Sequence, residues 1–309
     1  MEDRPGGRRA ASERQVAVAV APNGARRTKA DHPALPMTPA ELAGAAAECL
    51  DTGAAMIHVH VRRSDGLHVL DADAYRSALA AIRAAVGDQL VMQITTEALG
   101  LYSPDEQLAV VRDVKPEAVS IALREVVPDS AAEAAFIDFL HWAAREEIVP
   151  QVILYTPGEA GRLAELVRRG DLPWEDVPVL FVLGRYAAGQ LSQPTDLLPY
   201  LADRAPRFRD WMVCAFGRDE TACVVAAALL GGDVRVGFEN NLWLPDGSVA
   251  PSNVASVAAT AQALRRCGRA LASADDLRLR WGRLMHSGLR ETDLATGRAS
   301  PFPPMPQTG

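Results

Sequence analysis

Two histidines lie two residues apart in the segment Ile57-His58-Val59-His60-Val61-Arg62. In a β-strand, side chains alternate between the two faces, so His58 and His60 would share one face of this segment. Two imidazoles on one rigid strand can reach a single ion, because zinc binds nitrogen at about 2.0–2.1 Å. The spacing predicts a metal site, and the alternative interpretation is a pair of core histidines hydrogen-bonded to the backbone.

A catalytic zinc site needs a third protein ligand and an open coordination position. The segment Val234 to Phe238 is typical of a strand, and Glu239 follows it directly among apolar and amide residues. If side chains keep alternating, Arg235 enters the same interior below Glu239, where it needs an acidic partner or a substrate carboxylate. We predict Glu239 as the third metal ligand and Arg235 as a catalytic group; an ordinary ion pair at a strand end is the alternative.

Further polar side chains follow the third and fourth predicted strands. Thr95 and Thr96 precede Glu97, and Glu125 comes just after the fourth strand. Hydroxyl groups there could bind a substrate oxygen, although a threonine could equally cap the next helix. Glu97 and Glu125 are candidates for proton transfer, with a rim ion pair as the alternative. Weaker candidates are the remaining histidines, His32, His68, His141 and His286.

The elements that must position these residues follow an alternating pattern. Short runs rich in valine and isoleucine alternate with longer alanine-rich segments of helical period, which is typical of βαβ units around a buried parallel sheet. Eight repeats and polar strand ends predict an α/β fold, a (β/α)8 TIM barrel, rather than a doubly wound open sheet. The predicted strands are Val16 to Ala21, Met56 to Val61, Leu90 to Thr95, Ala118 to Leu123, Pro150 to Tyr155, Val177 to Leu183, Trp211 to Ala215 and Val234 to Phe238.

Helix starts and domain limits can also be placed. Thr38-Pro39 and Ser103-Pro104 each combine a capping residue with a proline in the first turn. Another helix is predicted from Pro251 to Arg266, and a last one, from Ser273 to Met285, is predicted to pack outside the barrel. We expect a single domain over residues 15–290, with mobile tails at residues 1–14 and 291–309.

Composition limits the class of protein. The 309 residues are 49% hydrophobic, which excludes disorder over most of the chain, and the net charge of -7 argues against nucleic acid as a partner. No apolar stretch is long enough for export or for membrane spanning, so we expect no membrane partner and a cytoplasmic location. The four cysteines form no CxxC pair and are predicted to be reduced packing residues.

Several separated motifs together resemble the beta-keto acid cleavage enzymes. They are Pro22-Asn23-Gly24-Ala25, Asp31-His32-Pro33, His58-Val59-His60 and Gly237-Phe238-Glu239-Asn240-Asn241, within a likeness from about residue 15 to 290. The resemblance implies a zinc-dependent barrel, expected to be a homo-oligomer, that converts a beta-keto acid and acetyl-CoA into acetoacetate and a new acyl-CoA. His58, His60 and Glu239 match the family's zinc ligands. Arg235 matches its catalytic arginine, and Thr95 matches a serine that helps to hold substrate.

Two positions depart from the family pattern. Arg26 stands where a member with an amino-bearing substrate has glutamate, which predicts a substrate tail that is not cationic. Asn240 stands where the family has aspartate, so Glu97 or Glu125 would have to move the proton. We predict five substrate-binding residues: Asn23, Arg26, Thr95, Thr96 and Asn240. The alternatives are a metal-dependent aldolase or lyase that needs no CoA, and a non-catalytic barrel that binds a metabolite.

Overall fold

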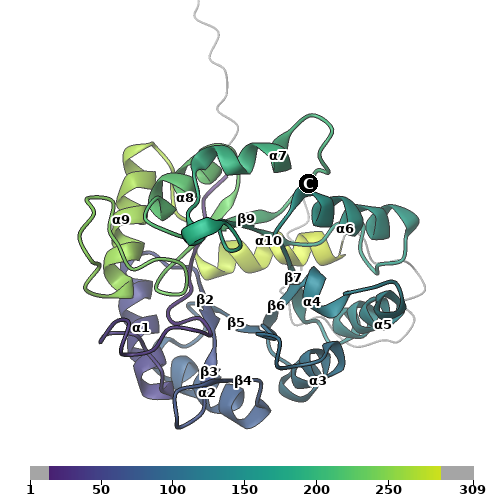
Figure 1. Cartoon of the computed structure of the whole chain (residues 1–309), viewed down its shortest axis with the longest axis horizontal. Helices are drawn as coiled ribbons and strands as arrows, with labels where there is room; N and C mark the ends of the chain where they lie inside the picture. The colour runs from purple at the N-terminus through teal and green to yellow at the C-terminus, as the bar shows by residue number, and fades with distance from the viewer. Residues whose placement is uncertain (1–13, 287–309) are drawn as a thin grey trace, which may run out of the picture.

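Eight parallel strands close into a barrel in the computed structural model, which describes residues 14–286 (Figure 1). The order around the barrel is β1-β10-β9-β8-β7-β6-β5-β2, so neighbours in sequence are neighbours in space. The predicted TIM barrel and its eight strand positions are therefore confirmed. The strands are β1 Val18–Val20, β2 Met56–Val59, β5 Val91–Thr95, β6 Ala118–Ala122, β7 Val149–Leu154, β8 Val179–Leu183, β9 Trp211–Ala215 and β10 Asp233–Val236.

Helices follow the strands around the barrel. The two predicted starts are confirmed, because Thr38 and Ser103 each accept from the backbone three residues on while Glu41 and Glu106 close a capping box. A short hairpin, β3 Val61–Arg62 with β4 His68–Val69, extends beyond β2. The helices are α1 Pro39–Thr52, α2 Ala72–Val86, α3 Pro104–Val114, α4 Leu123–Val126, α5 Ala131–Arg145, α6 Pro157–Arg169, η1 Ala188–Gln190, η2 Pro194–Leu197, α7 Leu198–Leu201, α8 Glu220–Leu229, α9 Asn253–Arg266 and α10 Ala274–His286.

The last helix, α10, packs outside the barrel as predicted, across the end at which the strands begin. Helix α10 crosses the middle of the view in Figure 1. Its side chains contact residues that precede the strands. Arg278 donates to the carbonyl of Leu90, just before β5, and Trp281 donates to Asp210, just before β9. The amino-terminal end of the barrel is thereby covered, which leaves the carboxyl ends of the strands as the accessible end.

The predicted tails fall mostly outside the described residues. Residues 1–13 and 291–309 lie there, as do residues 287–290 of the predicted domain. Arg14, the last residue of the predicted start, lies within the described residues: it donates to the carbonyl of Gly231 at 2.8 Å and pairs with the buried Asp233 at 2.9 Å. No helix within residues 14–286 is long and apolar enough to cross a membrane.

Candidate metal centre

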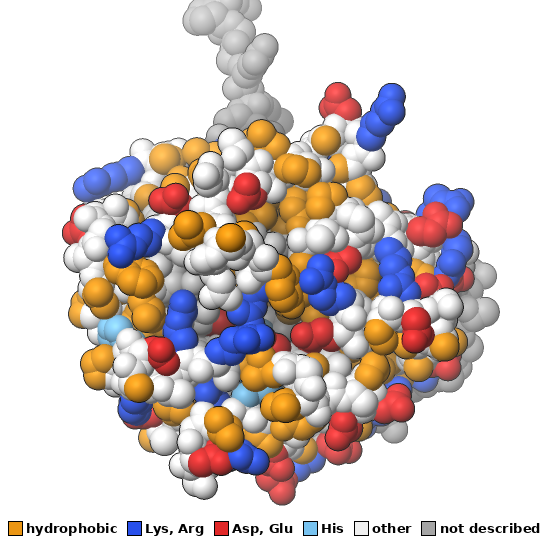
Figure 2. Space-filling model, viewed as in Figure 1, with side chains coloured by type: hydrophobic (Ala, Val, Ile, Leu, Met, Phe, Trp, Pro, Cys, Tyr) orange, Lys and Arg blue, Asp and Glu red, His pale blue; other side chains and the backbone are white. Residues whose placement is uncertain are grey.

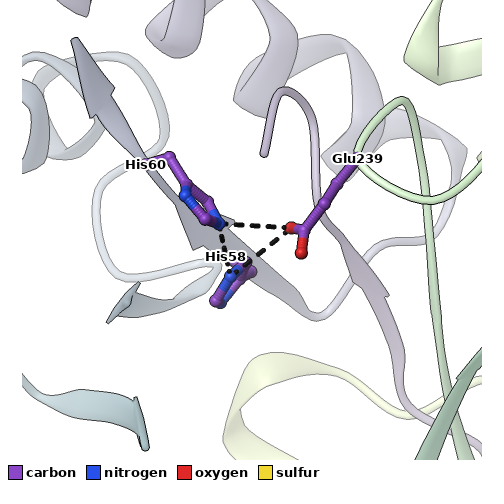
Figure 3. A group of neighbouring side chains, drawn as sticks. All are labelled: His58, His60 and Glu239. Carbon is purple, nitrogen blue, oxygen red and sulfur yellow. Dashed lines mark hydrogen bonds and ion pairs between the residues drawn. The ribbon is translucent and has the colours of Figure 1, made fainter. Parts of the chain in front are cut away.

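Three side chains meet at the carboxyl ends of β2 and β10 (Figure 3). The Nε2 atoms of His58 and His60 are 3.1 Å apart, and they lie 3.5 Å and 3.4 Å from Oε2 of Glu239. A tetrahedral ion with bonds of about 2.0–2.1 Å separates its ligand atoms by roughly 3.3–3.4 Å. The spacing of the three predicted ligands is therefore close to that of a tetrahedral metal site, and Oε2 of Glu239 is buried without a hydrogen bond.

Glu239 reaches this position by a turn and not by strand alternation. Strand β10 ends at Val236, two residues earlier than predicted. Gly237 has a φ of +134°, and a Cβ there would lie 2.5 Å from the carbonyl oxygen of Ala21, so only glycine fits. The backbone of Glu239 then donates to the same carbonyl at 3.1 Å. The β1 loop thus holds the third ligand against the two histidines.

Both imidazoles are buried beside polar groups. Nδ1 of His58 lies 2.8 Å from Oε1 of Gln93, and Nδ1 of His60 lies 3.8 Å from Oε2 of Glu97. Burial, reinforced by the nearby charge of Arg235, lowers the pKa of His58 to about 3. A neutral His58 offers a lone pair to a metal ion at ordinary pH, as a ligand must.

Arg235 lies beside the triangle in the barrel interior, as predicted. Its side chain is 3% exposed, and Nη2 contacts Oε1 of Glu239 at 3.0 Å and Sγ of Cys214 at 3.3 Å. Burial opposes the ionisation of Glu239, but Arg235 and the two histidines outweigh it and hold the pKa of Glu239 well below its usual range. Nε and Nη1 of Arg235 have no hydrogen-bond partner among the described residues, so they are available to a substrate anion.

A cavity opens from the triangle toward the accessible end of the barrel. Of the predicted catalytic and substrate-binding residues, Thr95, Glu97, Glu125 and Arg235 line it. In the view of Figure 2, lysine and arginine side chains gather near the centre of the face, next to acidic ones. The lining consists of His58, Thr95, Glu97, Ser120, Ala122, Glu125, Ile153, Tyr155, Val182, Arg185, Phe216, Arg235 and Glu239.

The two candidate carboxylates have different surroundings. Glu97 pairs with Arg185 at 3.0 Å and faces His60. Glu125 accepts a hydrogen bond from the backbone of Ala98, and burial together with the charge of Glu97 raises its pKa above the usual value. The pKa of Glu125 is thus shifted in the direction that suits a general base.

Four predicted substrate-binding residues do not line the cavity. Thr96 donates to the carbonyl of Ser120 at 3.2 Å and does not cap the next helix, whose N-cap is Ser103. Asn23 donates to the carbonyl of His60 at 3.0 Å and so supports a ligand instead of contacting the cavity. The side chain of Arg26 is exposed, whereas its neighbour Arg27 reaches the carbonyl of Phe238 beside Glu239; Asn240 turns toward helix α8.

Asn240 contacts a buried carboxyl group that the sequence did not single out. Glu220 on α8 accepts from the backbone of Gly237 at 3.2 Å and from the side-chain amides of Asn240 and Asn241 at 3.3 Å each. Burial raises the pKa of Glu220 to about 8, although these hydrogen bonds oppose the shift. Glu220 therefore anchors the turn that carries Glu239. In the sequence alone, Glu220 appears only as a polar residue of a helix.

Two further lining residues were also missed. Ser120 is 1% exposed, and its hydroxyl has no hydrogen-bond partner among residues 14–286 although it borders the cavity. Arg185 follows β8 and lies over the ring of Phe216. Strand alternation could have indicated Ser120, but the loop position of Arg185 carries no such signal.

The fold and the site together define the class of protein. It is a TIM barrel with a candidate metal centre, made of two histidines and a glutamate at the carboxyl ends of its strands. The family model of the beta-keto acid cleavage enzymes matches residues 15–282. The chain belongs to this family. It is 27% identical over 262 residues to 3-keto-5-aminohexanoate cleavage enzyme of Fusobacterium nucleatum, covering 82% of this chain and 93% of that protein.

Other relatives carry different substrate names. The chain is 24% identical to 3-oxoadipate:acetyl-CoA acetyltransferase of Cupriavidus necator, over 83% of this chain and 90% of that protein. A solved structure, the binary complex of ObcA with oxaloacetate, superimposes with a TM-score of 0.63 at 17% identity, covering 81% of this chain and 67% of that one. That likeness supports the barrel fold.

Proposed function

We propose that this protein is a zinc-dependent acyltransferase. It exchanges the acyl group of a beta-keto acid for the acetyl group of acetyl-CoA and so yields acetoacetate and a new acyl-CoA. The observation that carries the proposal is the ligand triangle of His58, His60 and Glu239, open toward a cavity that also holds Arg235. The names of the relatives support the same reaction class, since several combine a keto acid with acetyl-CoA.

The side chains around the triangle have different roles in the proposed reaction. Bound zinc would act as a Lewis acid toward the keto and carboxylate oxygens of the substrate. Glu125 removes a proton from the carbon between them, because its raised pKa and its place in the lining suit a base. Arg235 stabilises the oxyanion that develops when this carbon attacks the thioester. Glu97 pairs with Arg185 and lies near His60, so we assign it to orienting that ligand.

The charge of the substrate tail stays a prediction. Arg26 favours a tail that is not cationic, but its exposed side chain lies outside the cavity lining. Association into a homo-oligomer likewise stays a prediction from the family resemblance. A panel of beta-keto acids with cationic, neutral and anionic tails, assayed with wild type and Arg26→Glu, tests the first point. Preference of the wild type for cationic tails would contradict it.

The test of the function measures acetoacetate released from the same panel with and without acetyl-CoA. We expect turnover only with acetyl-CoA, loss of turnover after chelation, and recovery on adding zinc. His58→Ala should lose both zinc and turnover, whereas His141→Gln, on the outer helix α5, should keep both. Cleavage without acetyl-CoA would favour the aldolase or lyase alternative, and full activity of the metal-free protein would refute the mechanism.

A further inference from the structure

A chain of buried polar side chains crosses the barrel interior from the metal site. Oε1 of Gln93 on β5 lies 2.8 Å from Nδ1 of His58, and Nε2 of Gln93 donates to Oε1 of Gln151 on β7 at 3.1 Å. Nε2 of Gln151 in turn contacts Sδ of Met212 on β9 at 3.9 Å. Gln93, Gln151 and Met212 are at most 1% exposed, and none of them lines the cavity.

The contact with Met212 fixes the direction of the hydrogen bonds in this chain of side chains. A thioether sulfur accepts hydrogen bonds weakly and donates none, so Gln151 must turn its NH2 group toward Met212. Its carbonyl oxygen then faces Gln93, and only the NH2 group of Gln93 can satisfy it. In the reverse direction, the oxygen of Gln151 would face the lone pairs of the sulfur, and a buried acceptor would be left without a donor.

The direction decides which nitrogen of His58 carries the proton. The carbonyl oxygen of Gln93 accepts a hydrogen bond, so Nδ1 of His58 must donate it and carries the hydrogen. Nε2 is then left with a lone pair, which points toward Glu239 and His60. The reversed amide would place the hydrogen on Nε2, within the ligand triangle, and block the metal position.

We propose that Gln93, Gln151 and Met212 are positioning residues that hold His58 in its metal-binding tautomer. Neither Gln151 nor Met212 lines the cavity, and their hydrogen bonds lead to the metal site through Gln93, so we infer that their effect on the metal passes through Gln93. The inference rests on the proposed zinc site, although it concerns the metal-free protein directly. Groups that orient a metal-binding histidine typically change metal affinity by about 10–100-fold.

Nitrogen-15 NMR of the histidine side chains in the metal-free protein tests the tautomer. In the wild type, His58 should show a protonated Nδ1 and a bare Nε2, with its signals assigned by comparison with His58→Gln. Gln151→Leu removes the acceptor that holds Gln93, so the two forms should mix. Gln151→Glu keeps an acceptor toward Gln93 and should keep the wild-type tautomer.

Zinc affinity, measured by competition with a chelator, is the second measurement. We expect Gln151→Leu to weaken zinc binding about tenfold or more and Gln151→Glu to stay much closer to wild type. Gln107→Leu is the matched control, because Gln107 is a 1% exposed glutamine on α3 whose amide atoms have no partner among the described residues. If Gln151→Leu does not fold, Met212→Leu removes the sulfur at nearly constant volume and should also mix the tautomers.

The outcomes separate this inference from the proposed function. Unchanged tautomer and zinc affinity in both Gln151→Leu and Met212→Leu would overturn the inference and leave the zinc enzyme intact. An Nε2-protonated His58 in the wild type would overturn it as well. A wild type that shows the expected tautomer but binds no zinc would refute the proposed function, while the assignment of the chain's direction would stand.

Discussion

Removing the charge of Glu239 should destabilise the protein even when no metal is present. Glu239→Gln keeps the size of the side chain and a carbonyl oxygen, but it leaves the 3% exposed Arg235 without an anionic partner. Attraction across their 3.0 Å contact is about 5 kcal/mol at an effective dielectric constant near 20. Breaking a buried pair on one side typically costs about 3–5 kcal/mol. Because the amide still accepts a hydrogen bond, we expect a loss of about 3 kcal/mol.

The assay is urea and thermal unfolding in the presence of a chelator, which removes the contribution of bound metal to stability. A loss of 3 kcal/mol corresponds to a decrease in Tm of about 6–12 °C for a domain of this size. The double variant Arg235→Met/Glu239→Gln should be more stable than Glu239→Gln alone, because it buries no unpaired charge. A loss below about 1 kcal/mol in Glu239→Gln, or strictly additive losses in the double variant, would refute this reasoning.

Three other carboxyl groups give further predictions. The pKa of Glu220 is about 8 in the folded protein, above its ordinary value of 4.5, so the folded state binds more protons between these pH values and stability falls as pH rises through this range. Urea unfolding at pH 5 and pH 8 should show a smaller fall in Glu220→Gln, by a few kcal/mol, and parallel curves would contradict the assignment. Glu125→Gln should lower kcat by about 100-fold or more with zinc affinity retained, whereas Glu97→Gln should weaken zinc binding. Zinc loss in Glu125→Gln, or full turnover, would contradict the division of roles.

The sequence by itself determined the elements and the central pair of candidate metal ligands, His58 and His60. Alternating apolar strands and alanine-rich helices indicated the eight-stranded barrel, because a parallel strand that is buried on both faces consists of a continuous run of apolar residues. The spacing of His58 and His60 predicted that both imidazoles share one face. The alternation of side chains along a strand depends only on residues that are close in sequence. The caps at Thr38 and Ser103 are equally local, so they too were correctly predicted.

Only the tertiary structure decided how distant segments meet around that pair. Glu239 completes the triangle because Gly237 packs against the carbonyl of Ala21, a contact that exists only when β10 pairs with β1. The same closure separates Arg26 from the cavity and brings Arg185 and Glu220 to the site and to its supporting turn. A long-range contact depends on strand register and barrel closure, which no single segment encodes, and the amide chain from His58 to Met212 joins four strands in this way.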